Sequence, residues 1–364
     1  MTKKFKEIKV PKKIMERYLC SVEGRTIKLL QYKRLGSGWH GTGYEMVYRA
    51  GKKQKSVILR TLRPGSFSHD FVGDRAKVFI LQNELADNMP KHVESIDVGA
   101  YTKKGKLISI GEAAEFFQIV EKAHGTPYME NLERIKKEKK LKKKDRVKAL
   151  KLSNYLVSLH RKKYKGSKEL LESMKKRHLR DAIGHGEMLM GVLDTYPPKQ
   201  AWIKKGEVED IICKAVLYAA KVKENKSPLC RMHGDFHPGN ILFLKNGEFE
   251  LLDASRFLFG YAADDVTTLA INYIWFALME RGKFDGPFKE LFDIFWSNYL
   301  RKTKDRSVNI LAPLFFAFRG AVVAHPIFYG DQSNVTRRKI FNFIRNILKS
   351  KKFDPKRINK YLKG

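Results

Sequence analysis

A short polar segment next to an apolar stretch limits the folds that this chain can adopt. Residues 233–243 read HGDFHPGNILF, in which Asp235 and Asn240 stand five positions apart. The Pro-Gly pair between them combines a fixed φ angle with a permissive residue, so the segment can turn back on itself. The apolar run that follows predicts a short buried strand, a turn at residues 245–248 and a returning strand. This hairpin would carry Asp253 back beside Asn240.

These oxygen-bearing side chains suit phosphoryl transfer. That reaction needs a carboxylate to orient the acceptor hydroxyl, and oxygen ligands that hold Mg²⁺ against the phosphates. Mg²⁺ usually takes only one or two ligands from protein. We therefore expect Asp235 to orient the acceptor and take its proton, and Asn240 and Asp253 to hold magnesium. The alternative is that His233, Asp235 and His237 form a metal cluster or are ordinary loop residues, but the Asp-to-Asn spacing and the hairpin together favour phosphoryl transfer.

On these residues the chain resembles the aminoglycoside phosphotransferase-like family, which comprises small-molecule kinases of the protein-kinase-like fold. The catalytic loop of that family opens with His-Gly-Asp and closes with Asn before an apolar run, as residues 233–243 do. The resemblance implies that Asp235 is the catalytic base and that His233 braces the loop. It also implies that Asn240 and Asp253 are the magnesium ligands and that ATP is the phosphate donor, although the sequence does not exclude GTP.

The same resemblance implies the fold class and the division of the chain. An α+β, protein-kinase-like fold would have two lobes: a small β-rich N-lobe over residues 1–120 and a larger helical C-lobe over residues 127–364. The hinge at residues 121–126 would bind adenine through backbone groups of Glu121 and Ala123. The length agrees, because 364 residues exceed the usual size of a single core.

Two further segments are placed by the resemblance. Residues 115–120 should form an apolar strand leading into the hinge. Residues 262–273 resemble the step that opens a large C-lobe helix in the family and ties down the catalytic loop. Asp265 takes this supporting role, with Asp264 as its neighbour, since a carboxylate at a helix N-terminus satisfies free amides. The Asp-Phe-Gly signature of protein kinases is absent after Asp253, which favours the small-molecule branch.

A glycine-rich turn is the candidate clamp for the nucleotide phosphates. Residues 35–43 lie between two runs of β-prone residues and contain Gly36, Gly38, Gly41 and Gly43. Glycines let backbone amides approach phosphate oxygens closely. Glycine-rich hairpins also occur in purely structural sheets, which is the alternative interpretation.

Arg60 stands where kinase-like folds place the lysine that contacts the α and β phosphates. Arginine offers a planar fork rather than a point charge, so the exchange is not conservative. Alternatively, Arg60 is an exposed strand residue and Arg63 or a nearby lysine contacts the phosphates. An acid from the following helix should brace the cation; Asp74 and Glu84 are both candidates, and the sequence does not choose between them.

Substrate contacts are expected in the C-lobe. Residues 180–187 interrupt a helical pattern, and His185 and Glu187 are candidate substrate contacts there; a capped helix start with solvated polar residues is the alternative. His237, in the catalytic loop, is either structural or on the substrate side. Residues 310–329 are long enough to span a bilayer, but they contain two prolines and Arg319. A central arginine costs about 2.5–3.5 kcal/mol on insertion scales, so we expect buried helices, with Arg319 as a candidate cleft residue that contacts substrate.

The formal net charge of +34, from 73 Lys and Arg against 39 Asp and Glu, bears on partners rather than on fold. Much of it lies in residues 136–151 and 161–180, where apolar residues recur at helical spacing, so solvated helix faces explain most of it. Binding to nucleic acid or to an anionic surface is the alternative. Because such a field repels polycationic aminoglycosides, we expect a neutral or anionic small molecule with a hydroxyl group as the substrate.

The cysteines indicate a reducing compartment. Cys20, Cys213 and Cys230 have no metal-binding spacing and leave one unpaired in any disulfide scheme, which favours the cytoplasm. The basic residues 1–13 lack the apolar run of a signal peptide. Two functional alternatives remain: a nucleotide-binding pseudokinase, and a kinase of a protein or RNA-associated target. The sequence does not fix the oligomeric state.

Overall fold

The computed structural model describes residues 10–37, 41–64, 68–86, 89–91, 93–254 and 257–364. The chain divides into two compact units. One comprises residues 1–120 with 166–173, and the other comprises residues 121–165 with 174–364. The first unit contains the longest strands and the second contains most of the helices, which confirms the predicted α+β class with a small β-rich N-terminal part and a larger helical C-terminal part.

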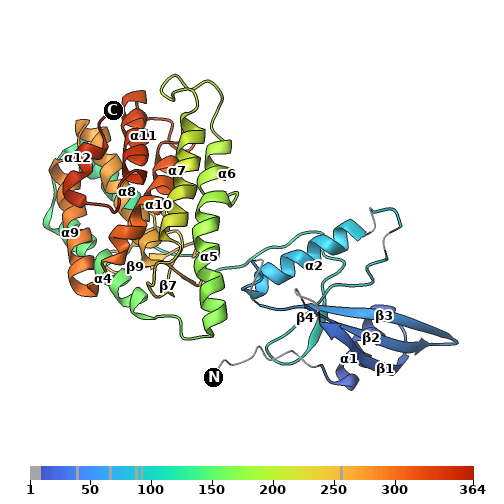
Figure 1. The fold of residues 1–364 in the computed structure, drawn as a ribbon. Helices are drawn as coiled ribbons and strands as arrows, with labels where there is room; N and C mark the ends of the chain where they lie inside the picture. The colour runs from blue at the N-terminus through green and yellow to red at the C-terminus, as the bar shows by residue number, and fades with distance from the viewer. Residues whose placement is uncertain (1–9, 38–40, 65–67, 87–88, 92, 255–256) are drawn as a thin grey trace. The chain divides into compact units, whose positions relative to one another are not determined.

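The N-terminal unit is built on an antiparallel sheet with the strand order β1–β2–β3 (Figure 1). Every second side chain of β2 is buried, as expected for a strand with one face on the core. The apolar residues Met15 and Leu19 of α1 join that core. The elements of this unit are α1 (Lys12–Glu23), β1 (Ile27–Ser37), β2 (Gly41–Ala50), β3 (Lys53–Leu62), α2 (Val72–Ala86), β4 (Gly99–Tyr101) and β5 (Leu107–Ser109).

The predicted glycine-rich turn contains fewer residues than expected, because β1 continues to Ser37 and β2 begins at Gly41. Gly36 and Gly43 lie opposite each other in the ladder between the two strands. Gly41 is also a strand residue, and a Cβ atom there would lie 1.7 Å from the carbonyl oxygen of Thr61 in β3, so only glycine fits. Gly38 lies outside the described residues.

The strand predicted at residues 115–120 is wrong. Residues 111–125 form neither helix nor strand, and Phe117 and Ile119 are each 87% exposed. The apolar composition indicated a strand, but a strand also needs a neighbour, and in the described part of the chain none pairs with this segment. The next strand, β6, begins only at Thr126 and pairs with β8.

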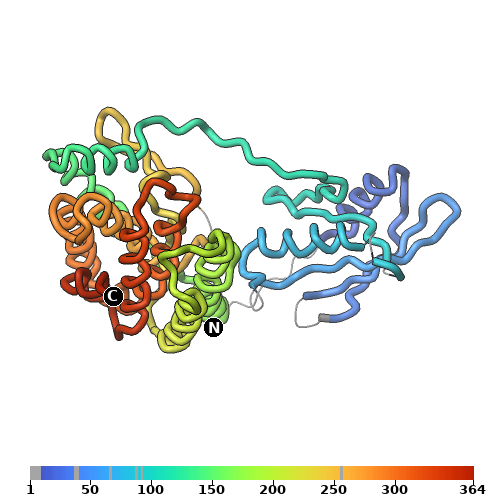
Figure 2. Tube along the Cα trace, turned by 90° about the horizontal axis from the view of Figure 1, so that it is seen from above, coloured from blue at the N-terminus to red at the C-terminus, as the bar shows by residue number. Residues whose placement is uncertain are grey.

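The C-terminal unit is a helical assembly around one central helix, α8, whose residues are buried on all sides from Ala262 to Leu278. α8 packs against α9 and α10, and the helices of this unit, green to red, gather together in Figure 2. Its elements are β6 (Thr126–Pro127), α3 (Tyr128–Glu138), α4 (Lys143–Arg161), α5 (Lys168–Gly184, of which residues 174–184 belong to this unit), α6 (Leu189–Asp194), α7 (Glu207–Val222), β7 (Cys230–Arg231), η1 (Pro238–Asn240), β8 (Ile241–Phe243), β9 (Phe249–Leu251), β10 (Phe259–Gly260), α8 (Ala262–Arg281), α9 (Gly286–Thr303), α10 (Ser307–Val323), α11 (Asn334–Leu348), η2 (Pro355–Arg357) and α12 (Ile358–Tyr361).

Two expectations from the sequence can be compared with the helices of this unit. The expected interruption at residues 180–187 begins later, because α5 continues through Gly184 and the chain turns only at residues 185–188. The apolar run after residue 310 forms the buried helix α10, which carries Pro313 in its interior. Among the described residues, helices that combine the length and apolar character needed to cross a bilayer are absent.

Candidate active site

The loop between β7 and β8 folds back on itself, as the Asp-to-Asn spacing predicts. Gly234 has a φ of 87°, a conformation that favours glycine. The single turn η1 follows, and the Nδ1 atom of His237 caps it by accepting the Gly239 N–H at 3.0 Å. As a result, the Asn240 Nδ2 atom donates to the carbonyl oxygen of Asp235 at 3.1 Å and lies 3.5 Å from its Oδ2 atom.

The predicted hairpin brings the backbone just before Asp253 to Asn240. β8 and β9 are antiparallel, with Ile241 opposite Leu251, and the Leu252 N–H donates to the Asn240 carbonyl oxygen at 3.0 Å. Asp253, the next residue, is exposed and has a φ of 51°, a left-handed conformation that Asp adopts more readily than most residues.

The donor atoms at this position fit a magnesium ion. Because the Nδ2 atom of Asn240 is committed to a carbonyl oxygen, its Oδ1 atom is the one that it can offer to a cation. Asp253 adds a carboxylate. A hard divalent ion prefers such oxygen donors and usually takes one or two from protein.

Asp265, near the start of α8, ties down the backbone of the loop. Its Oδ2 atom accepts the His233 N–H and its Oδ1 atom accepts the Gly234 N–H, both at 2.8 Å. The His160 Nε2 atom lies 3.1 Å from Oδ2, and the Nδ1 atom of the same ring contacts the Tyr299 hydroxyl at 2.7 Å. Asp265 is completely buried, and these contacts provide hydrogen-bond partners for both of its carboxylate oxygens. This is the contact that the resemblance to the kinase family implied.

His233 braces the loop as a neutral ring. Its Nδ1 atom accepts the Asp235 N–H at 3.2 Å. Burial lowers the pKa of His233, and the opposing charges of Asp265 and Asp235 do not offset this effect. The metal-cluster alternative finds no support, because no group of three His, Cys, Asp or Glu suited to a metal occurs among the described residues.

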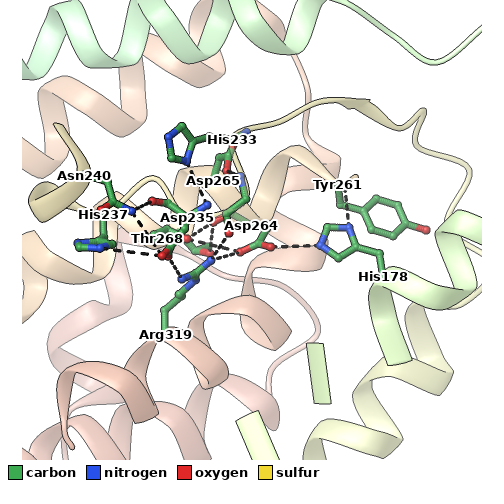
Figure 3. A network of polar contacts seen from close by, with 12 residues as sticks. His178, His233, Asp235, His237, Asn240, Tyr261, Asp264, Asp265, Thr268 and Arg319 are labelled. Atoms are coloured by element: carbon green, nitrogen blue, oxygen red, sulfur yellow. Dashed lines mark hydrogen bonds and ion pairs between the residues drawn. The ribbon is translucent and has the colours of Figure 1, made fainter. Parts of the chain in front are cut away.

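The carboxylate of Asp235 contacts a buried guanidinium from α10 (Figure 3). The Arg319 Nη1 atom lies 2.6 Å from Asp235 Oδ1, and its Nη2 atom donates to the Gly234 carbonyl oxygen and to Asp264 Oδ1, each at 3.0 Å. Arg319 is only 4% exposed. Burial lowers the pKa of this guanidinium, but the charges of Asp264 and Asp235 outweigh burial and raise it. The structure thus places Arg319, expected as a cleft residue, directly on the candidate catalytic carboxylate.

The second carboxylate, Asp264, has another partner in α5. Its Oδ2 atom lies 3.2 Å from the Nε2 atom of His178, whose Nδ1 atom accepts the Tyr261 N–H at 3.0 Å. A ring that accepts at Nδ1 carries its proton on Nε2, so His178 donates to Asp264. The backbone is close-packed here, because a Cβ atom at Gly260 would lie 2.6 Å from the His178 ring.

His237 and Tyr329 also lie near Asp235. The His237 Nε2 atom is 3.9 Å from Asp235 Oδ2, and 32% of its side chain is exposed, which suits the substrate side. Burial and the charge of Asp235 raise the pKa of Tyr329. His185 and Glu187, the other candidate substrate residues, are exposed in the turn after α5.

The remaining predicted residues concern the nucleotide. Glu121 and Ala123 lie in the irregular start of the C-terminal unit, where the His124 N–H donates to Glu250 of β9 at 2.8 Å. Arg60 is exposed on β3, opposite Gly43.

One of the two acids proposed to brace Arg60 has a local role. Asp74 accepts the Phe71 N–H at 2.7 Å and so caps the start of α2. The bracing of Arg60 by Asp74 or Glu84 stays a prediction.

Comparisons with known proteins give the following. No protein-family model and no curated protein matches the sequence. Among solved structures, the chain is similar to an amicoumacin kinase in complex with AMP-PNP, Ca²⁺ and Ami (14% identity, TM-score 0.40), with 93% of this chain and 94% of that chain covered. It is also similar to the aminoglycoside phosphotransferase APH(4)-Ia with ADP and hygromycin B (12%, TM-score 0.36; 91% and 98% covered). A Plasmodium vivax ethanolamine kinase shows 15% identity and a TM-score of 0.34, with 92% and 80% covered.

Identities and TM-scores this low assign neither an activity nor a substrate. The functional conclusion therefore depends on the residues of the site itself.

Sequence reasoning missed His178 and did not assign Asp264 or Arg319 to the carboxylate network. His178 contacts Asp264, Asp264 contacts Arg319 and Arg319 contacts Asp235, across sequence separations of 55 to 86 residues. One signal was available: an arginine inside an otherwise apolar helix requires a buried partner.

Proposed function

We propose that this protein is an ATP- and Mg²⁺-dependent phosphotransferase, a kinase that transfers the γ-phosphate to a hydroxyl group of a small molecule. The observation that carries the proposal is the folded-back loop that joins Asn240 to Asp235, together with the hairpin that returns the backbone before Asp253 to Asn240. Arg319 occupies the Oδ1 atom of Asp235, so we assign the Oδ2 atom to the acceptor hydroxyl, whose proton it would accept as phosphate transfer proceeds.

Asn240 and Asp253 would hold magnesium through the Asn240 Oδ1 atom and the Asp253 carboxylate. When bound, the ion neutralises charge on the phosphate oxygens. The contribution of the protein is to fix the donors, through the hydrogen bond from Leu252 N–H to Asn240 and through the Asp265 tether of the loop.

The proposal also names candidate residues for the nucleotide. We assign the phosphates to Arg60 and to the glycine-rich hairpin with Gly36, Gly38, Gly41 and Gly43. We assign adenine to backbone groups of Glu121 and Ala123, in the proposed hinge at residues 121–126.

We expect the acceptor to be neutral or anionic, because a net charge of +34 opposes the approach of polycations. Efficient phosphorylation of a polycationic aminoglycoside by the purified protein would contradict this expectation. The free thiols of Cys20, Cys213 and Cys230 suit a reducing compartment such as the cytoplasm.

The test is transfer of labelled γ-phosphate from Mg-ATP into a fractionated metabolite extract. Wild type is compared with Asp235→Asn, and Asp293→Asn serves as a control because that carboxylate pairs with Lys289 on the surface of α9. Label in a small molecule with wild type and Asp293→Asn, but not with Asp235→Asn, would support the proposal and isolate the substrate. Transfer that survives Asp235→Asn would refute it.

Two observations favour other functions. Arginine at position 60, in place of lysine, favours a pseudokinase; binding of Mg-ATP without any transfer would support that function. The basic helices favour a kinase of a protein or RNA-associated target. In the structure, however, Arg134 pairs with Asp145 at 2.6 Å and Arg146 with Glu290 at 2.5 Å, so acids offset part of this charge.

A further inference from the structure

We infer that Arg319 is a positioning residue for Asp235, and that Asp264 and His178 hold Arg319 in place. The inference rests on the proposed function, because it names the group that orients the proposed catalytic base. Arg319 would contact neither the acceptor nor the nucleotide. It would act by fixing the direction of the Asp235 carboxylate.

The first step of the argument is the geometry of the contact. One guanidinium contacts both Asp235 Oδ1 and the carbonyl oxygen of Gly234, the preceding residue. Guanidinium is planar and rigid, and its donors diverge in fixed directions. Two contacts from one rigid group therefore define the carboxylate relative to the backbone that carries it.

The second step is that Arg319 itself has little freedom. Its Nη2 atom also donates to Asp264 Oδ1, and the Phe318 ring lies 4.4 Å from the guanidinium carbon. Asp264 is completely buried and receives further hydrogen bonds from His178 at 3.2 Å and from the Thr268 hydroxyl at 3.4 Å. A continuous set of polar contacts thus runs from α5 through α8 to α10 and ends on Asp235 (Figure 3).

The third step concerns the energy of this arrangement. Burying a cation with two carboxylates costs desolvation free energy that the ionic attraction repays only in part, so apolar side chains of similar volume often give equal stability. Stability alone therefore does not explain Arg319. A defined orientation of Asp235 does, because the site gains a fixed geometry from the rigid fork.

The expected effect falls on transfer rather than on binding. Displacement of a reacting group by about 1 Å can cost about 100-fold in rate. Arg319→Lys keeps the positive charge but loses the fork, so we expect about a 100-fold lower kcat with an unchanged Kd for Mg-AMP-PNP. Arg319→Gln also loses the charge and should be slower still.

The experiment measures three quantities for each variant: the rate of label transfer to the metabolite fraction labelled by wild type, the Kd for Mg-AMP-PNP by calorimetry, and thermal unfolding. Arg338→Lys is the matched control. Arg338 also forks onto a buried carboxylate, Glu207, with contacts to both of its oxygens. It lies on α11, and within the described part of the chain its side chain bonds to Trp202, Glu207 and Asn342, which are not assigned to the site.

The ranking wild type, Arg319→Lys, Arg319→Gln in kcat, with equal Kd values and an active Arg338→Lys, would support the inference. Transfer by both Arg319 variants within about threefold of wild type would overturn it and leave the proposed function standing. Transfer that falls only in proportion to the folded fraction would also overturn it, since that marks a purely structural role. Wild type without Mg²⁺-dependent transfer would overturn the proposed function, and this inference with it.

Discussion

His178 and Asp264 form a hydrogen-bonded pair in the interior of the C-terminal unit, with 3.2 Å between Nε2 and Oδ2. Both side chains are completely buried. The pair joins α5 to α8 one contact away from the guanidinium that holds Asp235. A buried carboxylate depends on each of its donors, because an unsatisfied charged group in the interior is costly.

The loss of stability on replacement of His178 should therefore depend on whether the new side chain can still donate a hydrogen bond to Asp264. His178→Gln can keep an N–H directed at Asp264, whereas His178→Leu cannot. We expect His178→Leu to lower the free energy of unfolding by about 1–3 kcal/mol more than His178→Gln. Urea unfolding of the two variants measures this difference, and equal values would show that the hydrogen bond contributes nothing.

Asp265→Asn should destabilise the loop between β7 and β8, which carries the proposed catalytic residue Asp235. The carboxylate accepts two backbone N–H groups, from His233 and Gly234, but an amide has a single acceptor oxygen. We expect a loss of about 1–3 kcal/mol in the free energy of unfolding and a lower transfer rate. Urea unfolding and the label-transfer assay measure the two effects. Asp293→Asn, on the surface of α9, should change neither.

Asp253→Asn should weaken the use of magnesium. The substitution keeps an oxygen donor but removes the negative charge that attracts the ion. We expect transfer to require at least about tenfold more Mg²⁺ for half-maximal rate, equivalent to about 1.4 kcal/mol. A magnesium titration of the transfer rate measures this change. Glu248→Gln is the control, because that carboxylate lies in the hairpin turn and pairs with Lys151; a similar shift in both variants would contradict a specific role of Asp253.

Glu207 should make the stability of the protein depend on pH. Burial raises the pKa of this carboxylate, but the hydrogen bonds from Arg338 and from the Lys204 backbone outweigh burial, so the pKa lies below its ordinary value of 4.5. A lowered pKa in the folded state contributes stability above pH 4.5 that is lost as the pH falls through the folded-state value. Comparison of urea unfolding between wild type and Glu207→Gln from pH 3 to 7 should show a difference that shrinks in acid. A constant difference would contradict this linkage.

The sequence predicted the parts of the site that depend on local structure. The loop with Asp235 and Asn240 is followed directly in the sequence by the hairpin that leads to Asp253. Turn residues and strand patterns were therefore sufficient to predict both. The contact of Asp265 with the loop followed from the helix start and from the family resemblance.

The rest depends on packing between distant segments. Arg319 reaches Asp235 across 84 residues and His178 reaches Asp264 across 86, and no local pattern encodes which helix faces which. The error at residues 115–120 has a related cause, since apolar composition indicates a strand only where another strand offers its backbone groups.

The hydrogen bond between Leu252 N–H and the Asn240 carbonyl oxygen makes the position of the proposed magnesium donors independent of the length of the hairpin turn. The two proposed magnesium donors are set by this cross-strand contact and by the β8–β9 ladder, whereas the turn at residues 244–248 lies at the far end of the hairpin. Residues added to that turn would leave the donors where they are. Relatives of this protein can therefore carry the same pair of donors at quite different sequence spacings, and a search that fixes the interval between Asn and Asp would pass over them.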